Sequence, residues 1–198
     1  ELNLNQFDSI MVGPGIGIDS LDWSKSEEKL KSFNGLLILD ADALNRISRS
    51  NSGNDFFLER QSDTWITPHY GEFKRLFPNL DSKNNLEAAL YVARKFNIGI
   101  LLKGANSIIA DSENIAWQIY DSNFTSARAG LGDLLSGFIA GISALELSSG
   151  EKLRIESLAK YALLHSLAGR KCKSGSNASD IGKKLAKIVK KVKTRQML

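Results

Sequence analysis

Two glycines and an aspartate near residue 130 have the types and spacing that phosphate chemistry needs. Residues 129–133 read Ala-Gly-Leu-Gly-Asp and lead into a long apolar helical pattern. Free N–H groups and the positive end of the helix dipole meet there, so Gly130 and Gly132 are expected to bind a phosphate. The dipole also favours the ionised form of Asp133, which can act as a base on a substrate hydroxyl. Helix capping alone is the alternative, although one serine or asparagine would achieve it.

A second glycine-rich segment, residues 13–17, follows the first predicted strand and reads Gly-Pro-Gly-Ile-Gly. Such a turn brings backbone amides close to an anion or a nucleotide. It departs from the dinucleotide fingerprint, because G-x-G-x-x-G requires glycine where Ile18 stands. The G-x-x-x-x-G-K-[ST] pattern of P-loop NTPases is absent as well. Gly13, Gly15 and Gly17 therefore form either a binding loop or a structural turn.

Acidic residues and a histidine follow the next two predicted strands. Asp40 and Asp42 stand where carboxylates hold a cation or order water, and capping of the next helix by Asp42 is equally favoured. His69 can donate to a ligand at the sheet edge, but a structural role is the commoner one for an isolated histidine. Glu72 falls in a first helical turn, where a carboxylate is favourable with or without a metal. The metal ligands stay unassigned, with Asp42 and Glu72 as candidates.

A lysine ends a further predicted strand and opens the sequence Lys-Gly-Ala-Asn-Ser at residues 103–107. A lysine beside a small, flexible neighbour can reach the phosphates of a nucleotide as a point charge. A hairpin turn with an exposed Lys103 is the alternative.

Short β-rich runs alternate with helical patterns, which predicts an α/β layer fold. The helix that starts at Asp133 is apolar nearly all round and is expected to be buried and closely packed. His165 is expected to be a packing residue. We predict strands at 8–12, 36–40, 64–67 and 98–102, a hairpin of 107–111 with 115–120, helices at 22–33, 42–48, 86–96, 133–147, 153–170 and 180–192, and a long surface loop at 49–63.

The composition indicates one globular domain. The chain has 198 residues, of which 42% are hydrophobic and 24% charged, so it can bury a core and is not expected to be disordered. No uninterrupted apolar run approaches the roughly 18 residues that cross a bilayer. A single cysteine and the lack of a leader pattern predict a cytoplasmic protein.

Most of the positive charge lies in the last predicted helix. The net charge is +4, and removing the seven Lys and Arg residues between positions 183 and 195 leaves −3. These basic residues lie opposite an apolar stripe at helical spacing, and no aromatic residues interleave with them. A solvated helix face is therefore favoured over nucleic-acid binding.

Five motifs occur in one order along the chain, at residues 13–17, 39–45, 67–72, 103–107 and 129–133. This order resembles the ADP/ATP-dependent NAD(P)H-hydrate dehydratases, which form the C-terminal domain of bifunctional NAD(P)H-hydrate repair enzymes in the ribokinase-like superfamily. The resemblance covers nearly all 198 residues. It implies a three-layer α/β sandwich around a mostly parallel sheet. The opening region of the family is missing, so we expect residues 1–198 to be one N-terminally incomplete domain and this fragment to be compromised or inactive.

The resemblance implies repair of a damaged cofactor. The substrate would be the S epimer of hydrated NADH or NADPH, whose ring hydroxyl is phosphorylated by ADP or ATP with Mg²⁺ before phosphate is lost. Asp133 would be the catalytic base. Carried over to matching positions, the substrate-binding residues are Gly13, Gly15, Gly17, His69 and Asp133, and the nucleotide-binding residues are Lys103, Gly104, Ala105, Asn106, Ser107, Gly130 and Gly132.

The sequence departs from the family at three places. Tyr70 stands where the family usually has proline, Phe124-Thr125 replaces a Pro-Gly pair, and Arg170 replaces an acidic residue. By resemblance we also expect a homo-oligomer and a companion epimerase domain, fused or separate, with neither a nucleic acid nor a membrane as a partner. The alternative enzyme is a small-molecule kinase of the same superfamily, acting on a thiazole or hydroxymethylpyrimidine alcohol. A nucleic-acid-binding protein that uses the basic tail is the non-enzymatic alternative.

Overall fold

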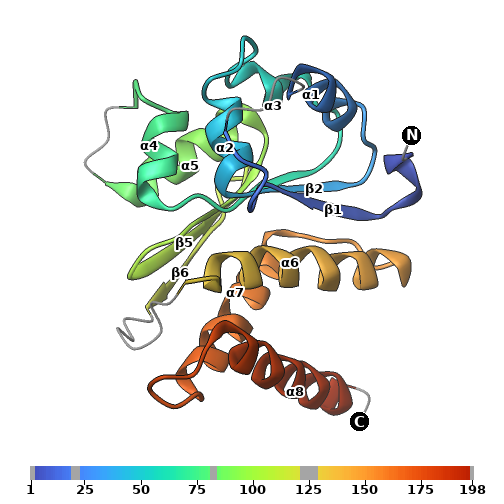
Figure 1. Cartoon of the computed structure of the whole chain (residues 1–198), viewed down its shortest axis with the longest axis vertical. Coiled ribbons are helices and arrows are strands. Elements are labelled where there is room, and N and C mark those ends of the chain that lie inside the picture. The colour runs from blue at the N-terminus through green and yellow to red at the C-terminus, as the bar shows by residue number, and fades with distance from the viewer. Residues whose placement is uncertain (1–2, 19–22, 81–83, 121–128, 197–198) are drawn as a thin grey trace.

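A single sheet organises the computed structural model, which describes residues 3–18, 23–80, 84–120 and 129–196 (Figure 1). Within these residues six strands lie side by side in chain order. The first four pair in parallel, and the last two form antiparallel pairs that end the sheet in a hairpin. The predicted strands and hairpin are confirmed as β1 (Ser9–Val12), β2 (Leu36–Leu39), β3 (Thr64–Ile66), β4 (Gly99–Leu102), β5 (Asn106–Ala110) and β6 (Ala116–Tyr120).

Helices cover both faces of the sheet and give the predicted α/β sandwich (Figure 1). On one face lie α1 (Trp23–Lys31), α2 (Ala41–Ile47), α3 (Asp55–Glu59), α4 (Tyr70–Leu76) and α5 (Asn85–Phe96). On the other face lie α6 (Leu131–Ser148) and α7 (Ile155–Arg170), with α8 (Ala178–Gln196) packed outside them.

The interior strand β2, which lies between β1 and β3, explains why two cores form. All four of its residues are buried, as expected for a parallel strand with helices on both faces. Side chains alternate along a strand, so Leu37 and Leu39 join the core under α1–α5, whereas Leu36 and Ile38 join the core under α6 and α7.

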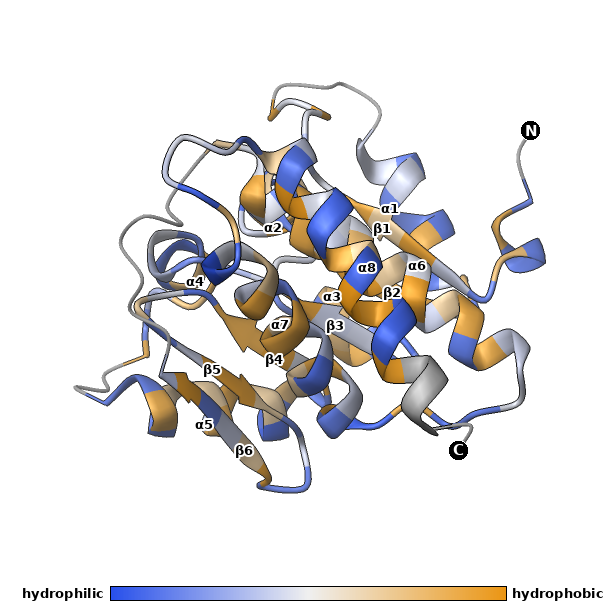
Figure 2. Ribbon diagram, turned by 90° about the horizontal axis from the view of Figure 1, so that it is seen from below, coloured by the Kyte–Doolittle hydropathy of each residue, from blue (hydrophilic) through white to orange (hydrophobic). Residues whose placement is uncertain are grey.

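The basic C-terminal helix α8 has the predicted two-sided pattern (Figure 2). Ile181 and Leu185 are buried against α6 and α7, and three further apolar residues of the stripe are partly buried. Lys183 and Lys187 are exposed on the other side. The solvated helix face expected for the lysines is confirmed.

The prediction of a surface loop over residues 49–63 is wrong for residues 55–59. The segment folds into α3, whose Phe56 and Phe57 are buried. These rings pack edge to face with each other, and Phe57 also contacts Phe77 and Phe96. The polar residues before α3 indicated a loop, but burial of the two rings is a tertiary effect that local composition does not contain.

Helix α6 is buried on one side only, whereas the sequence predicts that this nearly all-apolar helix is buried and closely packed. Ile139 and Ile142 face the sheet, but Gly137, Gly141 and Leu145 lie on an exposed side. A methyl group added at either glycine would meet no atom within 4 Å in the described part of the chain. By length and composition alone α6 passes as a candidate membrane span, whereas in the fold it packs against the sheet.

Candidate active site

The predicted site motifs meet at the carboxyl edge of the parallel strands. Gly13 follows β1, Asp40 follows β2, and Lys103 follows β4. The N–H of Lys103 donates to the carbonyl of Pro68 at 2.8 Å, and His69 pairs beside Lys103 as an isolated parallel bridge. Open α/β sheets bind ligands at this edge, so the fold brings the candidate residues to a place suited to binding.

Asp40 is the fully buried carboxylate of this edge. Its Oδ1 accepts from Lys103 Nζ at 2.7 Å and from the N–H of Ala41 at 2.9 Å. Its Oδ2 is buried, as is Oγ1 of Thr67, and neither atom has a hydrogen-bond partner among the described residues. Asp40 is thus the N-cap of α2, and the prediction that Asp42 caps this helix is wrong.

Asp42 and Arg46 instead hold the glycine-rich loop. Oδ2 of Asp42 accepts from the N–H of Gly17 at 2.9 Å. Arg46 donates from Nε to the Gly17 carbonyl at 2.5 Å and from Nη2 to the Ile16 carbonyl at 2.6 Å. Its guanidinium lies 5.3 Å from the centre of the Trp23 ring. Two side chains on one turn of α2 therefore fix the end of the glycine-rich loop, because one accepts from a backbone N–H group of the loop and the other donates to two of its carbonyl groups.

Close backbone approach explains the first glycine of this loop. A methyl group added to Gly13 would lie 1.7 Å from the carbonyl oxygen of Asp40, and the residue has φ of +144°. Gly15 and Gly17 also have positive φ, but an added methyl group would meet no described atom within 4 Å. Gly13 therefore allows the loop to pack against the backbone of Asp40 at the end of β2, whereas the space next to Gly15 and Gly17 is open.

His69 and Glu72 form a capping box at the start of α4. Nδ1 of His69 accepts from the N–H groups of Gly71 at 2.9 Å and Glu72 at 3.2 Å, and Glu72 Oε2 accepts from the His69 N–H at 2.8 Å. The His69 side chain stays 54% exposed. The structure thus gives His69 the expected structural role while leaving part of its ring accessible.

The two metal candidates both bind backbone. Glu72 accepts from the His69 N–H and Asp42 accepts from the Gly17 N–H. In the described part of the chain, no group of three or more His, Cys, Asp and Glu side chains is arranged to hold a metal ion. Their assignment as ligands stays a prediction, and Asp40, the other acidic residue singled out at this strand end, has an unpaired buried oxygen among the described residues.

The start of α6 has the geometry expected of an anion site. Gly130 is the N-cap with φ of +80°, and no side chain caps the helix. Asp133 lies exposed in the first turn. A methyl group on Gly132 would lie 3.5 Å from Lys103 Nζ, so the ammonium group sits beside the first turn of α6. Lys103 therefore connects this turn to Asp40 across the sheet edge.

Residues 103–105 form the turn between β4 and β5, and Asn106 and Ser107 begin β5. The Gly104 N–H donates to Ser107 Oγ at 3.4 Å, while Ala105 and Asn106 are exposed. The alternative of an exposed lysine in this turn is wrong, because the Lys103 side chain is only 22% exposed and pairs with Asp40. The exposed backbone of Ala105 and Asn106 thus lies close to Lys103, whose ammonium group is fixed by its ion pair with Asp40.

Breaking the Lys103–Asp40 pair is expected to destabilise the protein strongly. In Lys103→Met the carboxylate of Asp40, 1% exposed, would lose its charged partner. Removing one member of a buried pair costs about 3 kcal/mol or more. Urea unfolding of the variant measures this loss, and adding Asp40→Asn should recover most of it. A loss near 0.5 kcal/mol, typical of a surface lysine, would contradict the prediction.

His165 contacts the start of α6, in addition to its expected packing role. Its ring hydrogen-bonds to the backbone of Leu131, the first residue of α6, and its Nε2 is buried without a partner among the described residues. Burial lowers the pKa of His165 to about 4. The histidine is therefore neutral beneath the helix start at neutral pH.

This shift makes stability depend on pH. The unfolded chain protonates His165 near pH 6.5 and the folded one near pH 4, so its contribution is complete above pH 6.5 and is lost toward pH 4. Between pH 7 and pH 5 wild type should lose about 2 kcal/mol more than His165→Gln, which does not titrate. Urea unfolding at both pH values measures this, and equal losses would show that the buried histidine does not titrate as stated.

The fold and this strand-edge site define a protein of the ribokinase-like class. A solved ribokinase-like superfamily protein from Enterococcus faecalis superposes with a TM-score of 0.79 and 26% identity, covering 95% of this chain and 64% of that one. A family model described as NAD(P)H-hydrate dehydratase matches residues 1–191. The chain therefore belongs to the NAD(P)H-hydrate dehydratase family.

Individual relatives agree with this assignment. The "Bifunctional NAD(P)H-hydrate repair enzyme Nnr" of Synechocystis sp. is 37% identical over 169 residues, which are 85% of this chain and 31% of the relative. The ADP/ATP-dependent NAD(P)H-hydrate dehydratase of Bacillus subtilis, co-crystallised with ATP/Mg²⁺, has a TM-score of 0.73 at 23% identity and shares the fold. The alignment covers 93% of this chain and 64% of that one. The chain thus spans about a third of the bifunctional relative and under two thirds of the solved dehydratase.

Proposed function

We propose that the protein carries out ADP- or ATP-dependent dehydration of the S epimer of hydrated NADH or NADPH. The observation that carries the proposal is the start of α6. There an uncapped helix N-terminus with two glycines, an exposed aspartate and a lysine ammonium group lie together. Phosphoryl transfer relies on such preorganised donors for the charge of the moving group.

Each group has a role in the proposed reaction. Asp133 accepts the proton of the ring hydroxyl, whose oxygen then attacks the terminal phosphorus of the nucleotide. The bond from this phosphorus to the bridging oxygen breaks, and AMP leaves if the donor is ADP, or ADP if the donor is ATP. The N–H groups at Gly130 and Gly132 and the Lys103 ammonium stabilise the transferring phosphoryl group. Loss of inorganic phosphate, with a proton from the neighbouring ring carbon, restores the double bond of the reduced nicotinamide.

A magnesium ion fits this edge of the sheet. Oδ2 of Asp40 is buried and unpaired beside the Lys103 ion pair, and Thr67 Oγ1 is a second unpaired oxygen. Carboxylate and other oxygen donors are those that Mg²⁺ prefers. We assign Asp40 as the residue that holds Mg²⁺, with Thr67 as a second donor. The ion would neutralise charge on the nucleotide phosphates.

The decisive experiment incubates the full-length protein with hydrated NADH, Mg²⁺ and either ADP or ATP. We expect inorganic phosphate to be released and the near-ultraviolet absorbance of reduced nicotinamide to return. A kinase of the same fold would leave a stable phosphoester when given a thiazole or hydroxymethylpyrimidine alcohol. No recovery of absorbance with either nucleotide would refute the dehydratase activity.

The remaining expectations concern the binding partners and the cellular location of the protein. Binding to nucleic acid is the non-enzymatic alternative; it requires salt-dependent binding that disappears when residues 183–198 are deleted. The exposed lysines of this segment lie opposite the apolar stripe of α8. A companion epimerase domain, a homo-oligomer and a cytoplasmic location stay predictions.

A further inference from the structure

Arg46 on α2 is a buried arginine that binds the backbone of the glycine-rich loop at residues 13–17. It is 7% exposed, and its Nε and Nη2 donate to the carbonyl groups of Gly17 and Ile16. Burial of a guanidinium group is unfavourable unless its donors are paired. One turn earlier on α2, Asp42 accepts from the Gly17 N–H, so both polar backbone groups of this glycine are bound to α2.

The loop is fixed at both ends and exposed between them. At its start, Gly13 is buried against the backbone of Asp40, and the Ile16 N–H donates to the Gly13 carbonyl at 3.2 Å. At its end, the two side chains of α2 hold the last residues. Residues 15–17 are nevertheless exposed. Contacts behind the loop therefore set the conformation of backbone that a ligand can reach.

The strand order places this loop on the side of the reaction centre away from the nucleotide. The proposed nucleotide-binding turn follows β4, the loop follows β1, and Asp40 follows β2 between them. Asp40 contacts both neighbours, Lys103 Nζ through its carboxylate at 2.7 Å and Gly13 through its backbone. Because the nucleotide approaches from the β4 side, the hydrate is bound from the β1 side, where the loop lies.

We propose that Arg46 is a positioning residue for the hydrate, which acts by keeping the glycine-rich loop in its binding conformation. The inference rests on the proposed function, in which the ring hydroxyl of the hydrate reacts at Asp133. The apparent affinity for a ligand falls in proportion to the fraction of the protein whose site is in the binding conformation. Loosening the loop therefore weakens binding of the hydrate and leaves the chemical step unchanged.

The test uses Arg46→Met, which keeps an apolar stem but donates no hydrogen bond. In the full-length protein KM for hydrated NADH should rise about tenfold, whereas kcat and the affinity for ADP or ATP should not change. Hydrogen exchange of the backbone amides of residues 15–17, measured by mass spectrometry without ligand, should become faster. Arg46→Lys, which keeps one charged donor but not the fork, should give an intermediate KM.

Asp42→Ala tests the same loop through its other contact if Arg46→Met does not fold. It removes the acceptor of the Gly17 N–H from a side chain that is only partly buried. KM for the hydrate and the exchange of residues 15–17 should both rise, with the affinity for ADP or ATP unchanged. A lower nucleotide affinity with an unchanged KM for the hydrate would contradict the inference.

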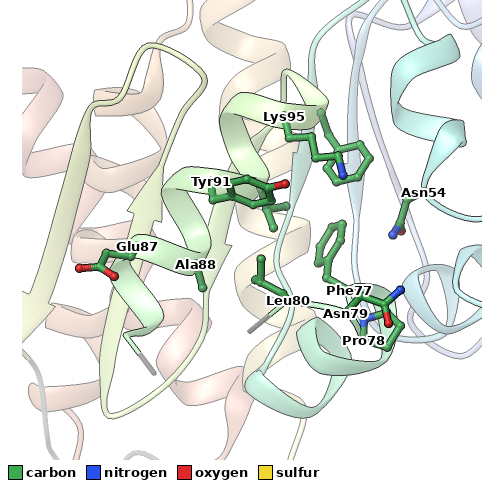
Figure 3. Close-up of a pocket in the computed structure, with 11 residues that line it drawn as sticks. Asn54, Phe77, Pro78, Asn79, Leu80, Glu87, Ala88, Tyr91 and Lys95 are labelled. Carbon is green, nitrogen blue, oxygen red and sulfur yellow. The ribbon is translucent and has the colours of Figure 1, made fainter. Parts of the chain in front are cut away.

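Two variants control for the loss of a buried arginine and of a cation beside an aromatic ring. Arg60 is also 7% exposed and donates to the backbone carbonyls of Phe33 and Gly35, at the opposite edge of the sheet. Lys95 Nζ lies 5.8 Å from the ring centroid of Tyr91, beside a pocket of about 480 Å³ on α5 (Figure 3). Arg60→Met should lower the free energy of unfolding. Neither Arg60→Met nor Lys95→Met should change KM for the hydrate or the exchange of the loop.

The outcomes separate this inference from the proposed function. An unchanged KM for the hydrate in Arg46→Met, an equal rise in Arg60→Met, or equal exchange of the loop in wild type and Arg46→Met would each overturn the inference. Failure of wild type to dehydrate hydrated NADH would refute the proposed function instead. The exchange measurement needs no activity, so it would still show whether Arg46 holds the loop.

Discussion

Asp133→Asn is expected to lower the turnover of hydrated NADH about a thousandfold while ADP or ATP still binds with nearly unchanged affinity. Asparagine keeps the size of the side chain but cannot accept the proton of the substrate hydroxyl, and loss of a general base costs rate of this order. The N–H groups of Gly130 and Gly132 come from backbone and remain in place. Recovery of reduced-nicotinamide absorbance measures turnover, and calorimetric titration measures nucleotide binding.

A matched substitution separates this effect from a general loss of charge at a helix start. Glu87 is an exposed acidic residue in the first turn of α5, as Asp133 is in the first turn of α6. Glu87→Gln should leave turnover unchanged. Near-normal turnover in Asp133→Asn would remove Asp133 as the base, and loss of nucleotide binding would give it a binding role instead.

Gly13→Ala should reduce the free energy of unfolding by about 3 kcal/mol or more. The new methyl group would lie 1.7 Å from the carbonyl oxygen of Asp40, a backbone atom that cannot rotate away, and alanine would have to adopt φ of +144°. Overpacking and backbone strain each cost about 1–3 kcal/mol. Urea unfolding measures the loss, and because Asp40 is displaced, catalytic activity should fall with it.

Gly15→Ala is the control for this substitution. Gly15 also has positive φ, +74°, but its added methyl group meets no described atom within 4 Å. The free energy of unfolding of this variant should therefore fall only by the cost of placing alanine at positive φ, about 1 kcal/mol. Equal losses in the two variants would mean that the contact with Asp40 does not decide the need for glycine at position 13.

The positions of the strands along the chain could be predicted because short, apolar runs are bounded by turn signals. Residues 36–39 are apolar without interruption and form an interior strand, and the polar residues 112–114 connect the predicted hairpin. The exposed face of α6 could not be predicted. Local composition records that Gly137 and Gly141 are small, but not whether a neighbour lies against them.

The candidate site also has one part that could be predicted from the sequence and one part that could not. Local patterns place Gly130, Gly132 and Asp133 at a helix start, because glycine and aspartate have defined roles there. The pair between Asp40 and Lys103 joins residues 63 positions apart, which single-sequence patterns do not connect. The contacts of Arg46 with the glycine-rich loop were missed for the same reason, since an arginine on a helix usually indicates a solvated face.

The packing of α6 against β1 also sets the order in which the site can assemble. Val12 ends β1 and Leu131 begins α6, so their docking closes a loop of 119 residue positions, whereas β5 and β6 pair across a short turn. Closing long loops costs entropy before contacts form, and such contacts slow folding. During synthesis, Gly13, Asp40 and Lys103 leave the ribosome well before α6 does. We therefore expect nucleotide-binding competence to be the last property that the folding chain acquires.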